Sequence, residues 1–343
     1  MAKSRNYIFT SIILVLIIFL TLRSIYDKDS LSTIFETVKN INVKYILLCI
    51  GIIVTYFILQ GIYMKAILKA LNYDVSLRRG IFYSIIEFYF SGITPSSTGG
   101  QPVQLYYMTK DGIPMRKSYI TLMLNTVYFK LIMLLFGIMV LLINNTYVFN
   151  GRMLYKVCFF AGFALDAAIV LLGILLLFKT SLVEYLYEKI VGFLKKFKFM
   201  KRKTDNSKEF IDKYKAEIDF INDHKMLVFQ TFILTVIQRL ALFSIIYVIY
   251  RALGYNSFSY IDILIIQLSV QMAIEALPLP GGAGISEGML YSIFVITFSE
   301  SMADSGMLLT RTFTFYLPLI ACGMIILLEY IYKKIKSRAV IEQ

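Results

Sequence analysis

Apolar residues form six runs along this chain that are each long enough to cross a bilayer. They cover roughly residues 7–26, 43–68, 118–143, 153–178, 226–250 and 306–332. A helix needs about 20 predominantly apolar residues to cross the hydrocarbon layer. No extended alternation of apolar and polar residues marks a β-barrel. The pattern therefore predicts an all-α polytopic membrane protein with about six full transmembrane helices.

Two further apolar stretches, 81–110 and 261–299, are each interrupted by a polar break rich in Gly and Pro. The breaks read TPSSTGGQPVQ at 94–104 and PLPGGAGISEG at 278–288. An unpaired backbone amide in hydrocarbon costs several kcal/mol, so such breaks persist only where they face protein or a polar cavity. In transporters, paired breaks of this kind point to a substrate site built from half-helices. Both stretches are therefore predicted to be re-entrant broken-helix hairpins.

Residues 179–225 form the one long polar stretch, and they are rich in Lys. Within it Phe210, Tyr214, Ile218 and Ile221 recur at helical spacing with charges between them. This spacing indicates an amphipathic helix on the membrane surface, and a solvated charged linker is the alternative. The whole chain, 1–343, is otherwise expected to be a single integral-membrane domain.

Composition supports a membrane class, since 58% of the 343 residues are hydrophobic and the mean hydropathy is +0.70. The net charge of +13 could suggest a nucleic-acid partner, but the basic residues cluster in loops beside the apolar runs. That is the positive-inside pattern, with anionic lipid as the counter-charge. The three cysteines are far apart in apolar segments and are expected to be packing residues. Residues 7–26 follow two basic residues without a cleavage site, and so are expected to be an uncleaved first helix.

Charge bias also predicts how the chain is threaded through the cell membrane. The basic residues near both termini, in 69–80, in 110–117 and in 179–225 place these segments inside. The loop 144–152 and the segment around 300–304 should then lie outside. In this scheme the two hairpins enter from opposite faces, which is the arrangement that inverted repeats produce.

Several charged residues fall inside the predicted spans and hairpins. Lys130 and Asp166 are central in their runs, and an ion pair between them is the simplest solution, because an unpaired charge at mid-bilayer costs about 3 kcal/mol or more. Arg239, also central, is the best candidate to bind a lipid phosphate. Arg311 lies nearer an outer end and could instead snorkel to the interface. Glu87 in the first hairpin could pair with any of these cations.

The breaks themselves offer a place for a phosphate. Pro102 suits the first turn of the helix that follows the first break, where Thr98 or Gly100 could be the cap, and Ser286 could cap the helix after the second. Helix N-termini directed inward favour a phosphate group. Glu287 could hold a cationic headgroup or a proton, or only stabilise the helix dipole.

The candidate substrate-binding residues gather on the breaks and on facing polar positions. Gln267, Gln271 and Glu275 are spaced four apart and share one helix face, which should point inward. Re-entrant loops that only pack the core remain the alternative explanation of the breaks. The complete candidate set comprises Thr94, Pro95, Ser96, Thr98, Gly99, Gly100, Gln101, Gln104, Arg239, Gln271, Glu275, Pro280, Gly281, Gly282, Gly284, Ser286, Glu287 and Arg311.

No set of nucleophile, base and acid is visible, and neither is a metal cluster or a P-loop, so no catalytic residue, metal or cofactor is expected. Any active transport would have to draw on an ion gradient or on lipid asymmetry. His224, the lone histidine, lies in the basic linker and is expected to be solvated.

Three stretches resemble the integral-membrane domain of the lysylphosphatidylglycerol synthase/flippase family. They are 94–112 (TPSSTGGQPVQLYYMTKDG), 279–288 and, more weakly, 311–317 (RTFTFYL). The resemblance runs over nearly the whole chain. Full-length members add a soluble C-terminal domain that transfers lysine to phosphatidylglycerol. This chain stops about ten residues after its last predicted helix, so it is expected to be a stand-alone form without that enzyme.

The leading functional hypothesis is a flippase-like translocator of phospholipid headgroups. The resemblance implies aminoacylated phosphatidylglycerol as substrate, and a polyprenyl-phosphate-linked sugar is a second candidate. One rival is a lipid-modifying transferase with an intramembrane site, or a membrane subunit of a separately encoded synthase. Another is a structural scaffold. Expected partners are membrane phospholipid, such a synthase and a second copy of the chain, but not nucleic acid.

Overall fold

The computed structural model describes most of the membrane-spanning part of the chain. Described are residues 41–94, 97–143, 153–179, 223–275 and 302–341, the short pieces 181–185, 188–189, 214–216, 218–219, 294–295 and 297–298, and the single residues 39, 212 and 291. The predicted first span at 7–26 and the second break at 278–288 lie outside these residues.

Five of the six predicted spans fall in the described part, and all five are helices long and apolar enough to cross a membrane. They are α3 (Val43–Ala70), α6 (Met115–Ile143), α8 (Met153–Phe178), α11 (Lys225–Phe243) continued by α12 (Ile245–Ala252), and a last span. The last span consists of α15 (Ala303–Arg311), a π-helical turn (Thr312–Tyr316) and α16 (Leu317–Ile341). The described residues contain no strand, so the all-α polytopic fold is confirmed.

The first predicted hairpin is formed by α4 (Leu77–Ile93) and α5 (Gly100–Lys110), with the Gly/Pro break between them. Neither helix reaches the length of about 20 residues that a full span needs. The Ser76 side chain caps α4 by accepting a hydrogen bond from the Arg79 amide. Arg79, at the start of α4, forms an ion pair with Asp111, at the end of α5. The hairpin therefore leaves and returns at the same end of the molecule.

The second hairpin begins with α13 (Tyr260–Glu275), which packs against α8 and α6. Gly162 of α8 permits a close approach, because a Cβ atom there would overlap the Met272 carbonyl oxygen. The ring of Phe298, beyond the break, lies 5.7 Å from that of Tyr255, which precedes α13. This segment also returns to the end at which it entered.

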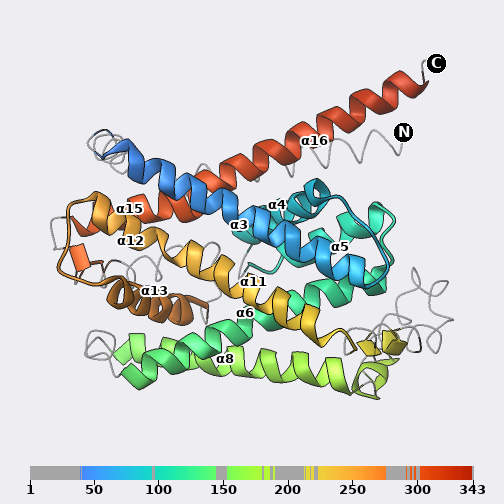
Figure 1. Ribbon diagram of the computed structural model, residues 1–343, viewed down its shortest axis with the longest axis horizontal. Coiled ribbons are helices and arrows are strands. Elements are labelled where there is room, and N and C mark those ends of the chain that lie inside the picture. The colour runs from blue at the N-terminus through green and yellow to red at the C-terminus, as the bar shows by residue number, and fades with distance from the viewer. Residues whose placement is uncertain are drawn as a thin grey trace.

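The two hairpins enter at opposite ends of the molecule (Figure 1). One hydrophobic cluster joins the end of α3, the base of the first hairpin and the start of α6. Another joins the end of α6, the start of α8, α12, α13 and Phe298. Lys117 donates a hydrogen bond to the Asn72 carbonyl, 3.4 Å away, and Lys333 lies 3.7 Å from Asp111. The segments 69–80 and 110–117 and the end of α16 thus share one face, here called the basic face, as the charge bias requires.

The polar linker is not entirely a surface element. Tyr214 and Ile218, from the predicted amphipathic stretch, are buried in the cluster at the basic face, 1% and 2% exposed. The Tyr214 hydroxyl donates to the Leu176 carbonyl at 3.2 Å, and burial raises its pKa, so it keeps its proton. Phe210 and Ile221 lie outside the described residues. This piece of the linker packs into the protein rather than lying on lipid.

Cysteine labelling tests which side the basic face takes. The native cysteines are all buried, so single cysteines placed at the exposed positions Lys110, His224 and Ser257 should dominate the signal. We expect a membrane-impermeant maleimide to label the Ser257→Cys variant in intact cells, and the other two only after permeabilisation. Labelling of all three cysteines from the same side would contradict the fold. If the label instead reached Lys110→Cys and His224→Cys in intact cells and Ser257→Cys only after permeabilisation, the fold would stand and the orientation in the membrane would be the opposite one.

Candidate functional site

A turn closed by Thr94 forms the first break. The Thr94 hydroxyl donates to the Phe90 carbonyl at 2.6 Å and accepts from the Gly99 amide at 2.9 Å. The Ser97 amide donates to the Thr94 carbonyl, and Ser97 adopts a φ of 54°. One side chain thus satisfies backbone groups that hydrocarbon would leave unpaired. Pro95 and Ser96 lie outside the described residues.

The helix after the break begins differently from the prediction. Gly99 is the N-cap residue of α5, with no side-chain cap bond, so the expected caps Thr98 and Gly100 are wrong. Thr98 is exposed, and Gly100 is the first helical residue. Pro102 does lie in the first turn. The cap residue has no side chain because the turn is tight here: a Cβ atom on Gly99 would lie 2.5 Å from Cγ2 of Thr94.

A group of polar and aromatic side chains comes from α4 of this hairpin and from four other helices. We call it the charged seam. Its members are Tyr56 of α3, Glu87 of α4, Phe129 and Lys130 of α6, Asp166 of α8 and Arg239 of α11. Sequence reasoning named all its charged residues, because a charge inside an apolar run is easily recognised. It missed the two aromatic members, which look like ordinary core residues.

Arg239 is central in the seam. Its guanidinium carbon lies 4.2 Å from the centre of the Phe129 ring and 5.5 Å from that of Tyr56, and Nη1 donates to the Tyr56 hydroxyl at 3.4 Å. The Glu87 carboxyl interacts electrostatically with Arg239 and accepts a hydrogen bond from Ser91 at 3.3 Å. Arg239 Nε is buried and, within the described part of the chain, has no hydrogen-bond partner. The arginine therefore retains donor capacity for an anion.

Lys130 and Asp166 lie together, as the sequence suggested. Lys130 Nζ is 2.7 Å from Asp166 Oδ1, with side chains 13% and 0% exposed. Lys130 Nζ also lies 5.1 Å from the centre of the Phe129 ring, which therefore contacts both seam cations. The pair neutralises two charges at membrane depth, and the other two charges of the seam are Arg239 and Glu87.

A glutamine pair supports the seam. Gln238 Nε2 donates to Gln60 Oε1 at 2.8 Å and to the Tyr56 carbonyl at 3.1 Å. Both glutamines are 1% exposed. These bonds hold α11 against α3, and thereby fix the direction in which Arg239 projects.

The remaining predicted residues are distributed over several places. Gln101 faces α6 and donates a hydrogen bond to Thr126. Gln104 is 0% exposed, and neither of its amide atoms has a partner in the described region. Gln271 lies on α13, and Glu275 ends that helix, although its side chain is outside the described residues. Outside them as well are Pro280, Gly281, Gly282, Gly284, Ser286 and Glu287.

Arg311 belongs to a feature that the sequence did not reveal. It ends α15 directly before the π-helical turn, and its guanidinium lies 5.9 Å from the Phe315 ring. Phe315 and Leu319 in turn pack against Gly92, just before the first break. Single π-helical turns inside helices occur frequently at functional sites. The motif at 311–317 therefore lies against the end of α4 that leads into the first break.

A second missed feature is the charge network at the base of the first hairpin. Arg79 bonds Asp111 and, 3.1 Å away, Glu329 of α16, and Lys333 lies 3.6 Å from Glu329. Tyr83 donates to Asp111 at 2.8 Å. Asp111 lies in the stretch that carried the family resemblance, which was the one available signal. The network fastens the hairpin to the last span.

Comparisons with known proteins agree with this architecture. The family described as the lysylphosphatidylglycerol synthase TM region matches residues 8–322. A UPF0104 membrane protein of Archaeoglobus fulgidus is 26% identical over 296 residues, which are 79% of this chain and 83% of that relative. No solved structure matches the chain.

Removing either partner of the Lys130–Asp166 pair should destabilise the protein. Breaking a buried pair leaves an unmatched charge and typically costs about 3–5 kcal/mol. We expect the variants Lys130→Ala and Asp166→Ala to give a lower yield of folded protein in detergent by size-exclusion chromatography. The double variant Lys130→Asp/Asp166→Lys should recover part of it. Equal losses in all three would show that the contact does not stabilise the fold.

Packing at the break is tested by Gly100→Ala. The new methyl group would meet the Glu87 carbonyl oxygen, so α5 must move away from α4 and the thermal midpoint in detergent should fall by several degrees. Gly51→Ala is the matched control, because a Cβ atom there meets nothing within 4 Å. An unchanged midpoint for Gly100→Ala would contradict the tight contact.

Proposed function

The chain belongs to the family of the lysylphosphatidylglycerol synthase transmembrane region, and from that premise we propose that it moves phospholipid headgroups between the two leaflets. The observation that carries the proposal is Arg239: a membrane-embedded arginine, next to a broken hairpin, that keeps a buried Nε without a partner in the described region. Intramembrane charges usually mark a substrate or ion pathway.

The geometry supports a path for a headgroup rather than a reaction centre. A phosphate could replace the weak bond from Arg239 to Tyr56, since guanidinium groups bind phosphate through several donors at once. Glu87, which interacts electrostatically with Arg239, could hold a cationic headgroup such as an amine, and we propose the same role for Glu287 of the second break. Among the described residues, no group of three or more His, Cys, Asp or Glu could hold a metal ion.

The substrate that this arrangement favours carries both a phosphate and a positive charge. Lysylated phosphatidylglycerol has both, and we propose it as the first lipid to test. A lipid-phosphate-linked sugar would need only the arginine. The charge requirement at Glu87 therefore distinguishes the two lipid classes.

We expect Arg239→Ala to slow leaflet exchange of every phospholipid tested. The lost charged hydrogen bonds are worth about 1.5–3 kcal/mol, or roughly tenfold or more in rate. The measurement is the exchange of labelled phosphatidylglycerol, with and without lysine, in liposomes at matched levels of folded protein. Arg251→Ala is the control, an exposed arginine at the end of the same span. Equal exchange by wild type, Arg239→Ala and empty liposomes would reject the translocator.

A further inference from the structure

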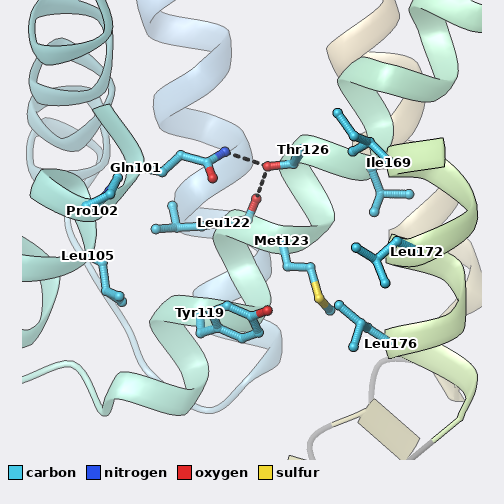
Figure 2. A pocket seen from close by; sticks show the side chains of 12 residues that line it. Gln101, Pro102, Leu105, Tyr119, Leu122, Met123, Thr126, Ile169, Leu172 and Leu176 are labelled. Atoms are coloured by element: carbon cyan, nitrogen blue, oxygen red, sulfur yellow. Dashed lines mark hydrogen bonds between the residues drawn. The ribbon is translucent and has the colours of Figure 1, made fainter. Parts of the chain in front are cut away.

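A groove runs between α5, α6 and α8, apart from the charged seam (Figure 2). Its volume is about 360 Å³, within the range typical of small-molecule sites. Helix α6 forms the floor, and α5 and α8 form the walls. The residues that line it are Gln101, Pro102, Leu105, Tyr119, Leu122, Met123, Thr126, Val127, Ile169, Leu172, Gly173 and Leu176.

The lining suits a hydrocarbon chain. Apart from Tyr119, the polar side chains on it are Gln101 and Thr126, and these satisfy each other: Gln101 donates to Thr126, which donates to the Leu122 carbonyl at 3.0 Å. Figure 2 shows this pair at one end of the groove and the aliphatic side chains beyond it. The groove therefore offers packing surface but demands no polar atom from a ligand.

Position in the membrane decides what fills the groove. On α6 it extends from Tyr119 to Val127, about 12 Å along the helix, in the half of the span next to the basic face. Arg116 precedes Tyr119 by one turn, and the exposed Lys179 follows Leu176 by one turn. Tyr119 is 42% exposed, and tyrosine at this level is typical of a membrane interface. The groove thus opens on lipid tails, with positive charge at the level of the headgroups.

We propose that the groove binds one acyl chain of an anionic phospholipid from the leaflet at the basic face, whose phosphate lies beside Arg116 and Lys179. Lipid tails are as apolar as leucine, so packing in the groove gives little preference over the bilayer by itself. Selectivity must then come from the basic residues, which attract anionic headgroups. A second transmembrane helix is a poorer occupant, because the concave surface is only about two helical turns long. The site goes beyond the proposed transport activity and does not depend on it.

The absence of tryptophan from the chain allows a direct test. In vesicles that contain phospholipids with brominated acyl chains, a single introduced tryptophan is quenched by the chain that contacts it. Tyr119→Trp places the reporter in the groove. Tyr106→Trp is the control. Tyr106 is 58% exposed and does not line the groove, and it lies only four residues before the end of α5 at the basic face.

We expect brominated phosphatidylglycerol to quench the Tyr119→Trp variant half-maximally at a mole fraction about fivefold lower than brominated phosphatidylcholine does. Adding Lys179→Gln should reduce that preference. The control reporter, which lies beside Lys110 but outside the groove, should show a clearly weaker preference. Equal behaviour of the two reporters, or no preference for the anionic lipid, would overturn the proposal.

A second pair of variants keeps the test decisive if Tyr119→Trp does not fold. Leu172 lines the groove at 49% exposure, and Leu171 beside it is 60% exposed and does not. The Leu172→Trp variant should show the preference for brominated phosphatidylglycerol, and the Leu171→Trp variant should show a clearly weaker one. Selective quenching without leaflet exchange would support the groove and contradict the transport proposal alone.

Discussion

Hydrocarbon cannot hydrogen-bond, and this constraint shapes the first break and the buried charges of the molecule. A backbone that breaks inside the membrane, or a charge placed there, must find its partner within the protein. The Thr94 hydroxyl serves the Phe90 carbonyl and the Gly99 amide together, which allows the chain to turn between α4 and α5. Lys130 and Asp166 meet the same requirement by pairing across two spans. The tight contacts between these elements follow from the need to exclude unpaired groups.

A buried polar group that lacks a partner in such a protein indicates a place where a ligand can bind. Arg239 is held by two aromatic rings and one hydroxyl, a set that retains the side chain but leaves its Nε without a hydrogen-bond partner among the described residues. The first break and the π-helical turn approach the same region, through Gly100 on Glu87 and Phe315 on Gly92. Three departures from regular helix or apolar composition, remote in sequence, thus meet in one part of the membrane interior.

Features that depend on composition along the chain could be predicted from the sequence. The five described spans, the first hairpin and the Lys130–Asp166 pair each follow from the cost of polar groups in hydrocarbon, which acts locally and strongly. The N-cap at Gly99 was missed because it depends on the contact of Gly99 with the Thr94 side chain within the turn, and the π-helical turn because nothing in 311–317 differs from an α-helical pattern. The burial of Tyr214 depends on helix ends that are remote in sequence. The network of Arg79, Asp111 and Glu329 joins residues up to 250 positions apart, and no periodicity reports such a contact.

That network also bears on how such chains can diverge. Arg79 is shared by two carboxylates on different elements, and Lys333 contacts both of them. Loss of the arginine would leave two partly buried acidic groups facing a single lysine, whereas loss of one carboxylate would still leave the arginine matched. Substitution should therefore be tolerated in a fixed order, acidic positions first and the arginine only afterwards. Related sequences are expected to vary at these positions in concert, even though the three residues lie in separate parts of the chain.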